Sequence, residues 1–185
     1  MASLEDLRNS LPEVAKDIRV NLQTVLDVAT LTPAQKWGVA AACAVASRNA
    51  QLRDAVLAEA RTQAGDAVVE DARAAAILMG MNNVYYRFLH LTTSEEYGRL
   101  PAKLRMNVIG NPGTAKEDFE LWCLAVSAVN ACGKCVDAHE KVLRGAGMTV
   151  EQIQAAVRIA SVVHAVAVTL EAEGALAPQA VAEAA

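Results

Sequence analysis

The sequence predicts an all-α fold, a compact bundle of helices, on three observations. Hydrophobic residues make up 54% of the 185 residues, but aromatic residues only 4%, so the core must be built from Ala, Val, Leu and Ile. Alanine is the best helix former, and small side chains let helices approach closely. Helix start signals and helix stop signals alternate along the chain. A single domain over 1–185 is expected, since this length is sufficient to bury a core.

Helix starts are marked by Ser or Thr residues that are followed, three positions on, by an acid or an amide. Such pairs cap the free amides of a first helical turn reciprocally. They are Ser3 with Asp6, Thr32 with Gln35, Thr114 with Glu117, and Thr149 with Gln152. Pro33 suits the first helical position. The glycine-containing stretches 110–113 and 145–147 predict helix ends.

These signals divide the chain into ten expected helices and a tail. The helices are expected over 3–10, 12–27, 33–47, 50–63, 66–89, 93–98, 101–109, 115–130, 132–145 and 149–173. The tail, 176–185, is expected to be flexible, as chain ends usually are.

A weak internal repeat suggests that the bundle is a duplicated helical unit, with halves of about 1–110 and 111–175. At an offset of 85 positions, Trp37 aligns with Trp122. In this register Ser47 stands opposite Cys132, so only the second half carries the cysteine pair. Many of the other matches are Ala with Ala, and chance remains an alternative.

Charge and hydropathy argue against a nucleic-acid-binding, a secreted or a membrane-spanning protein. The net charge is −4 and no Lys/Arg cluster is present, so nucleic-acid binding is not expected. The first 25 residues read as an amphipathic helix rather than a secretory signal. No run of about 18 apolar residues is present, because Arg158, Ser161 and His164 interrupt the most apolar segment. A cytoplasmic protein without a membrane span is expected.

The motif Cys132-Gly133-Lys134-Cys135 carries the chemistry. Positions i and i+3 of a helix share a face, so the two thiols can close a disulfide with little backbone movement. A thiolate is the reactive form, and three features are expected to lower the thiol pKa. They are the start of a helix at Cys132, the cation of Lys134, and His139, which lies one turn after Cys135.

The remaining cysteines and histidines leave alternatives open. Cys43 and Cys123 are expected in the core, where free cysteine is common. A structural zinc site would need about four ligands. Only His139 is near the cysteine pair, so His90 and His164 would have to converge from elsewhere. Coincidence is a further alternative. A thioredoxin fold is discounted because it needs strands around the motif.

Glu120 lies twelve positions before Cys132. On one straight helix that separation is about 18 Å, too far for direct assistance. Glu120 can assist the thiols only if the chain bends near Asn130-Ala131, or if one helix packs back on the other. The alternative is that Glu120 stabilises the start of its own helix.

Together these residues resemble a known family. The pattern of Glu120, Cys132, Cys135, His139 and the following Glu140 is similar to alkyl hydroperoxidase D, in the carboxymuconolactone-decarboxylase-like superfamily. The stretches 11–17, 79–87 and 104–113 agree as well, and the similarity runs from about residue 3 to 175. The resemblance implies an all-α fold with a duplicated unit, and a homotrimer.

The resemblance also implies an activity, an antioxidant thiol peroxidase that reduces alkyl hydroperoxides. Cys135 would attack the peroxide and become a sulfenic acid, Cys132 would be the proton donor and resolving thiol, and Glu120 with His139 would form a proton relay. No cofactor is expected to be bound. The electron donor would be the dihydrolipoyl group of an acyltransferase, recharged by dihydrolipoamide dehydrogenase, and a partner peroxiredoxin, alkyl hydroperoxide reductase C, would be reduced in turn.

One departure from the family pattern concerns Lys134. Family members carry His between the two cysteines, and a Lys transfers protons poorly at neutral pH. Peroxide turnover is therefore expected to be slower than in family members with this His. The rate of disulfide exchange with partners should be reduced less. Two other functions stay as alternatives, a non-redox decarboxylase of the same fold and a zinc-stabilised helical interaction module.

Overall fold

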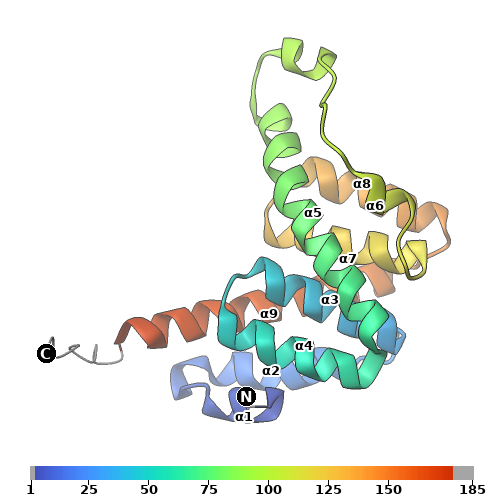
Figure 1. Ribbon diagram of the computed structural model, residues 1–185. Helices are drawn as coiled ribbons and strands as arrows, with labels where there is room; N and C mark the ends of the chain where they lie inside the picture. Colours follow the sequence, from blue (N-terminus) through green and yellow to red (C-terminus); the bar gives the residue numbers. More distant parts are fainter. Residues whose placement is uncertain (1–2, 177–185) are drawn as a thin grey trace, which may run out of the picture.

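Helices make up all the regular secondary structure of the described residues. The computed structural model describes residues 3–176, and in this range all regular secondary structure is helix and none is strand (Figure 1). The predicted all-α fold is confirmed. The predicted flexible tail lies outside the described residues, apart from its first position.

The observed elements follow the predicted order closely. They are α1 Leu4–Ser10, η1 Glu13–Ala15, α2 Lys16–Leu26, α3 Pro33–Ala46, α4 Ala50–Ala64, α5 Asp66–Leu91, η2 Glu95–Arg99, α6 Asn107–Gly110, α7 Lys116–Val129, α8 Gly133–Gly145 and α9 Val150–Leu176. One predicted helix is largely wrong. Only the last part of 101–109 is helical, since 100–106 has no regular structure.

Three of the four predicted caps form and one does not. Ser3 with Asp6 and Thr32 with Gln35 make reciprocal capping boxes, and the same pair of hydrogen bonds joins Thr149 and Gln152. Thr114 does not cap α7. Its amide and its hydroxyl both donate to Asp71 on α5, at 2.7 and 2.8 Å, which diverts the side chain from the helix start.

Helix α3 forms the centre of the core and packs against α4, α5, α7 and α9. Its middle, from Val39 to Ala44, is fully buried and consists mostly of alanine. Gly38 allows the closest approach: a Cβ atom there would lie 2.1 Å from the Trp122 ring of α7. Small residues in α3 thus allow α3 and α7 to pack close together.

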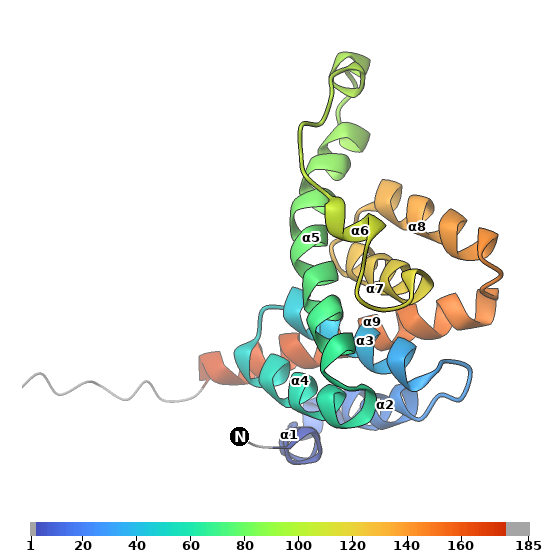
Figure 2. The same cartoon turned by 45° about the vertical axis from the view of Figure 1, so that its right-hand side comes forward.

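Two sets of three successive helices have a similar order of lengths, and the first set begins with α3 itself. In both α3–α4–α5 and α7–α8–α9, two medium helices precede a long one. The predicted internal repeat remains a prediction. Figures 1 and 2 show α5 rising out of the body, with η2 at its far end and the chain returning through α6 to α7. The projecting part therefore consists of the end of α5, η2 and the segment that follows.

Helix α9 is long and apolar enough to cross a membrane by length and composition, with a mean hydropathy of 1.7 over Val150–Gly174. In the structure its Ile159, Val163 and Val166 belong to the core, and it packs against α2, α3 and α7. The same test is passed by core helices of soluble proteins. The absence of a membrane span stays a prediction.

Candidate active site

The cysteine pair lies at the turn that joins α7 to α8. Ala131 takes a left-handed conformation, with φ of +54°, and this reverses the chain direction between the two helices. The amide of Cys132 donates to the carbonyl of Ser127 at 3.0 Å, and the carbonyl of Cys132 accepts from Cys135 at 3.0 Å. Cys132 is thus the first residue before α8, as predicted, and Cys135 lies in its first turn.

The two sulfur atoms face each other. Cys132 Sγ donates to Cys135 Sγ at 2.7 Å. A disulfide has a sulfur separation of about 2.05 Å, so a small movement closes the bond. All four cysteines are thiols in the structure, and all four are buried. Cys132 is fully buried and Cys135 is 5% exposed, so both thiols are largely shielded from solvent.

Glu120 and His139 form a buried pair beside the thiols. Glu120 Oε2 and His139 Nδ1 are 2.6 Å apart, and both side chains are at least nine-tenths buried. The contact exists because α8 packs back along α7 after the turn. Glu120 lies beyond the first turn of α7, whose acidic residues are Glu117 and Asp118, so its carboxylate is engaged by His139 rather than by its own helix start. His139 follows Cys135 by one helical turn, on the same face of α8.

The pKa of the Cys135 thiol is raised to about 12. Burial is the main cause, because it disfavours the charged thiolate, and the adjacent Cys132 thiol adds to it. The Asn83 side chain and the Lys134 cation act in the opposite direction, but do not prevail. The expectation that local features lower the thiol pKa is thus wrong for Cys135. The sequence shows the nearby cation but not the burial.

The Lys134 side chain contacts helix α5. Its Nζ atom lies over the Tyr86 ring of α5, 5.9 Å from the ring centre. A cation at such a distance is attracted by the face of the ring. The residue that replaces the family's histidine therefore links α8 to α5.

Polar residues of α5 complete the site, and they were not predicted individually from the sequence. Asn83 donates to Ser127 Oγ at 2.9 Å and accepts from the Asn130 amide at 2.9 Å. Arg87 donates to the Asn130 carbonyl at 2.7 Å. These bonds fix α5 to the turn before Cys132. The sequence feature that could have indicated them is the pair Asn82-Asn83 within an apolar helix. Burying such polar side chains costs free energy unless they are hydrogen-bonded.

The remaining predicted residues lie elsewhere. Cys43 and Cys123 are fully buried, as predicted. Burial raises the pKa of the Cys123 thiol, with the charges of Glu120 and Cys135 adding to the effect. Within residues 3–176 no three His, Cys, Asp or Glu side chains come together to hold a metal ion. His164 does not approach the cysteine pair, because its Nδ1 lies 3.4 Å from Ser47 Oγ between α9 and the end of α3.

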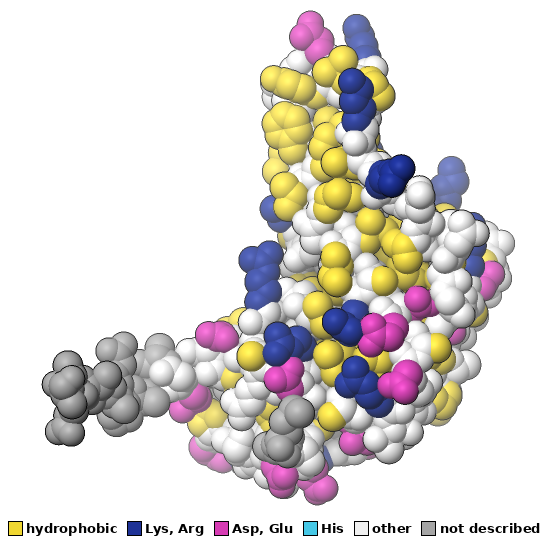
Figure 3. All heavy atoms as spheres, viewed as in Figure 1, with side chains coloured by type: hydrophobic (Ala, Val, Ile, Leu, Met, Phe, Trp, Pro, Cys, Tyr) yellow, Lys and Arg dark blue, Asp and Glu magenta, His cyan; other side chains and the backbone are white. Residues whose placement is uncertain are grey.

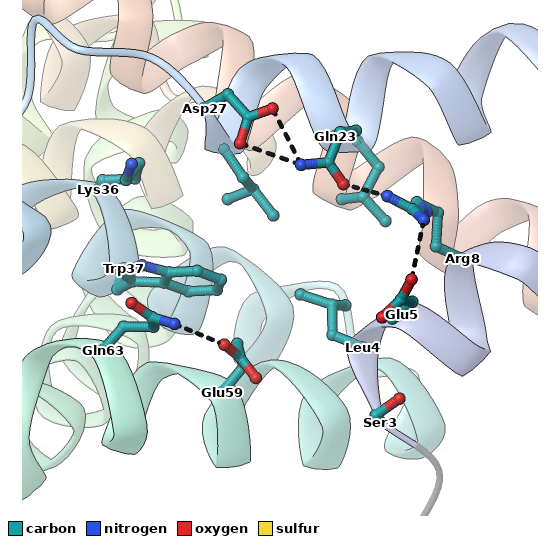
Figure 4. Close-up of a pocket in the computed structure, with 12 residues that line it drawn as sticks. Ser3, Leu4, Glu5, Arg8, Gln23, Asp27, Lys36, Trp37, Glu59 and Gln63 are labelled. Atoms are coloured by element: carbon teal, nitrogen blue, oxygen red, sulfur yellow. Dashed lines mark hydrogen bonds and ion pairs between the residues drawn. The ribbon is translucent and has the colours of Figure 1, made fainter.

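A cavity of about 470 Å³ lies among α1, α2, α3 and α4, with the Trp37 ring at one wall (Figure 4). Its polar groups bind one another. Gln23 links Arg8 to Asp27, and Gln63 donates to Glu59 at 2.8 Å. None of the four predicted site residues lines this cavity. It is therefore separate from the cysteine site.

Comparison with known proteins gives consistent relatives. Residues 95–178 match the carboxymuconolactone decarboxylase family. Over 170 residues, the chain is 57% identical to the alkyl hydroperoxide reductase AhpD of Brucella anthropi, covering 92% of this chain and 97% of that one. It is 56% identical over 185 residues to AhpD of Anaeromyxobacter dehalogenans, with both chains fully covered. The similarity to AhpD of Solibacter usitatus is 54% over 170 residues, 92% of this chain and 96% of that protein.

Proposed function

Because the chain belongs to the AhpD family, with a carboxymuconolactone decarboxylase domain, we propose that it is an alkyl hydroperoxide reductase. The observation that carries this proposal is the buried thiol pair, with its sulfur atoms 2.7 Å apart, next to the Glu120–His139 pair. A pair of adjacent thiols is the donor set that a two-electron reduction requires.

The proposed reaction uses both thiols in turn. Cys135, as the thiolate, attacks the terminal oxygen of the hydroperoxide, the oxygen–oxygen bond breaks, and the alcohol leaves with one proton. Cys135 is then a sulfenic acid. Cys132 attacks this sulfur and releases water, which leaves a Cys132–Cys135 disulfide. The 2.7 Å separation of the sulfur atoms supports the second step.

Glu120 and His139 are proposed to move the protons. The raised pKa of Cys135 keeps this thiol protonated at neutral pH, so a base must take the proton as the peroxide is attacked. An imidazole held by a buried carboxylate suits that role, because the carboxylate stabilises the imidazolium that forms. The 2.6 Å contact between them supports this assignment.

The electron donor and the partners follow the family resemblance. A dihydrolipoyl group on an acyltransferase, recharged by dihydrolipoamide dehydrogenase, would reduce the disulfide by thiol–disulfide exchange. The reduced pair could then also reduce a partner peroxiredoxin. No bound cofactor is required for either step. We also propose a cytoplasmic homotrimer.

The test is a stepwise cycle on the reduced protein. One equivalent of an alkyl hydroperoxide is added, and disulfides are located by peptide mass mapping. Dihydrolipoamide is then added and its oxidation is followed. We expect a Cys132–Cys135 disulfide that dihydrolipoamide removes. Cys43→Ala is the matched control, because Cys43 is equally buried but lies in the central helix, and it should complete the same cycle. If the wild-type thiols stay reduced, the proposal fails.

A further inference from the structure

Among the buried side-chain nitrogen and oxygen atoms of the described residues, one has no hydrogen-bond partner. Asn82 is 4% exposed, and its Oδ1 atom accepts no hydrogen bond. Leaving a buried acceptor unsatisfied costs roughly 1–3 kcal/mol. Most such groups in folded proteins are bonded, so an exception needs an explanation.

The unpartnered atom belongs to a residue at the attacking thiol. The main-chain oxygen of Asn82 lies 4.0 Å from Cys135 Sγ, across the contact between α5 and α8. The next residue behaves differently, since Asn83 is held at both ends by Ser127 and Asn130. Asn83 is therefore bonded within the resting protein, whereas Asn82, whose main-chain oxygen contacts the reacting sulfur, keeps an open acceptor in its side chain.

We propose that Asn82 is a substrate-binding residue, whose Oδ1 accepts the O–H of the terminal hydroperoxide oxygen at Cys135. The inference rests on the proposed function. The thiolate takes this terminal oxygen together with its hydrogen, and the alcohol leaves from the other side of the broken oxygen–oxygen bond. The same O–H is afterwards the hydroxyl of the sulfenic acid. In this proposal the same acceptor serves the hydroperoxide before the oxygen transfer and the sulfenic acid after it.

This role predicts opposite effects on stability and on reaction. A residue that only supports the fold destabilises it when replaced. Removing an unsatisfied acceptor while keeping its shape is neutral or stabilising. Asn82→Leu, which has a similar shape and no acceptor, should therefore leave the melting temperature unchanged or raise it, while it slows the reaction with a hydroperoxide. Asn83→Leu is the matched comparison and should melt lower, because it removes two formed hydrogen bonds.

The experiment compares two reactions of Cys135 in reduced wild type and Asn82→Leu. The rate of oxidation by cumene hydroperoxide is expected to fall about tenfold, the usual effect of losing one hydrogen bond to a reacting group. The rate of alkylation by iodoacetamide, which presents no O–H, is expected to stay within about twofold. If the leucine variant does not fold, Asn82→Ala replaces it. The same slower oxidation and nearly unchanged alkylation are expected for it.

Three results would overturn the inference. The first is an unchanged rate with cumene hydroperoxide in both variants. The second is an equal fall in both rates, which would mean that Asn82 acts on the thiol itself. The third is a melting temperature lowered as in Asn83→Leu, which would mean that Oδ1 has a resting partner such as a bound water. Wild type that does not react with cumene hydroperoxide would instead refute the proposed function, and the inference with it.

Discussion

At the scale of single residues, burial sets the chemistry of the site. Cys132, Cys135, Glu120 and His139 are all removed from solvent. Burial keeps the Cys135 thiol protonated at neutral pH, yet the same burial strengthens the interaction between Glu120 and His139. The site thus holds a weakly acidic thiol next to a group suited to accept its proton. Such an arrangement favours proton transfer during the reaction over a permanently formed thiolate.

The raised pKa of Cys135 gives a testable pH dependence. Alkylation by iodoacetamide follows the thiolate fraction, which grows tenfold per pH unit below the pKa. For an ordinary thiol, with a pKa of about 8.5, the alkylation rate stops rising once the pH exceeds that pKa. With a pKa raised to about 12, Cys135 should react more and more rapidly through pH 10 without levelling off. The rate is measured by mass spectrometry of the Cys135 peptide. The chain unfolded in urea is the control, and its rate should level off near pH 9. Levelling near pH 9 in the folded protein would contradict the assignment.

At the scale of helices, the site depends on the close contact of α3 with α7. Trp122 packs against Gly38 and donates to the Gln35 carbonyl at 3.3 Å. Trp122 lies two residues after Glu120, so the contact that fixes α7 also fixes the carboxylate that reaches His139. The position of the Glu120–His139 pair is thereby tied to the core.

Gly38→Ala should strongly destabilise the protein. The new Cβ would lie 2.1 to 2.4 Å from three atoms of the Trp122 ring, which is fully buried and cannot move aside. Overpacking of this kind costs about 3 kcal/mol, or roughly 6–12 °C in melting temperature for a chain of this size. Thermal unfolding followed by circular dichroism measures the change. Gly80→Ala is the control, because a Cβ there meets nothing within 4 Å, and it should be neutral or stabilising. Equal melting temperatures for wild type and Gly38→Ala would show that the contact is not tight.

At the scale of the whole molecule, the main unexplained feature is the apolar projection. Large apolar side chains are exposed along the end of α5, along η2 and just after it, and Figure 3 shows them on the part that rises from the body. They are Val84, Phe88, Leu91, Tyr97 and Leu100. Contiguous exposed apolar surface marks an interaction site. We therefore assign this projection to the contact between copies in the proposed homotrimer.

Leu91→Glu should weaken that assembly. Leu91 is 71% exposed, so the substitution costs little in the isolated chain, but a buried charge in an interface is unfavourable. Wild type should show the mass of three 19.5 kDa chains by light scattering, and the variant a lower mass. Val14→Glu is the control, because Val14 is 91% exposed but lies in η1, between α1 and α2, and Figure 1 shows these two helices at the end of the molecule opposite the projection. A wild-type mass of one chain would refute the trimer, and an unchanged variant would refute the assignment of the projection.

The features that arise from neighbours within one helical turn could be predicted from the sequence. The all-α fold, the capping boxes at Ser3 and Thr32, and the shared face of Cys132 and Cys135 all follow from contacts three or four positions apart. Burial of Cys43 and Cys123 followed from their apolar surroundings. Because these interactions are local, propensity and spacing are sufficient to predict them.

Only the tertiary structure decided the features that join distant segments. The reversal at Ala131 brings Glu120 to His139, and a contact across 43 positions takes Thr114 from its expected cap to Asp71. Burial of the thiol pair raised the pKa of Cys135 where local charges suggested a decrease. The open acceptor of Asn82 became visible only when α5 was placed against α8. The physical reason is the same in each case, since burial and long-range hydrogen bonds depend on how helices pack rather than on the residues within each helix.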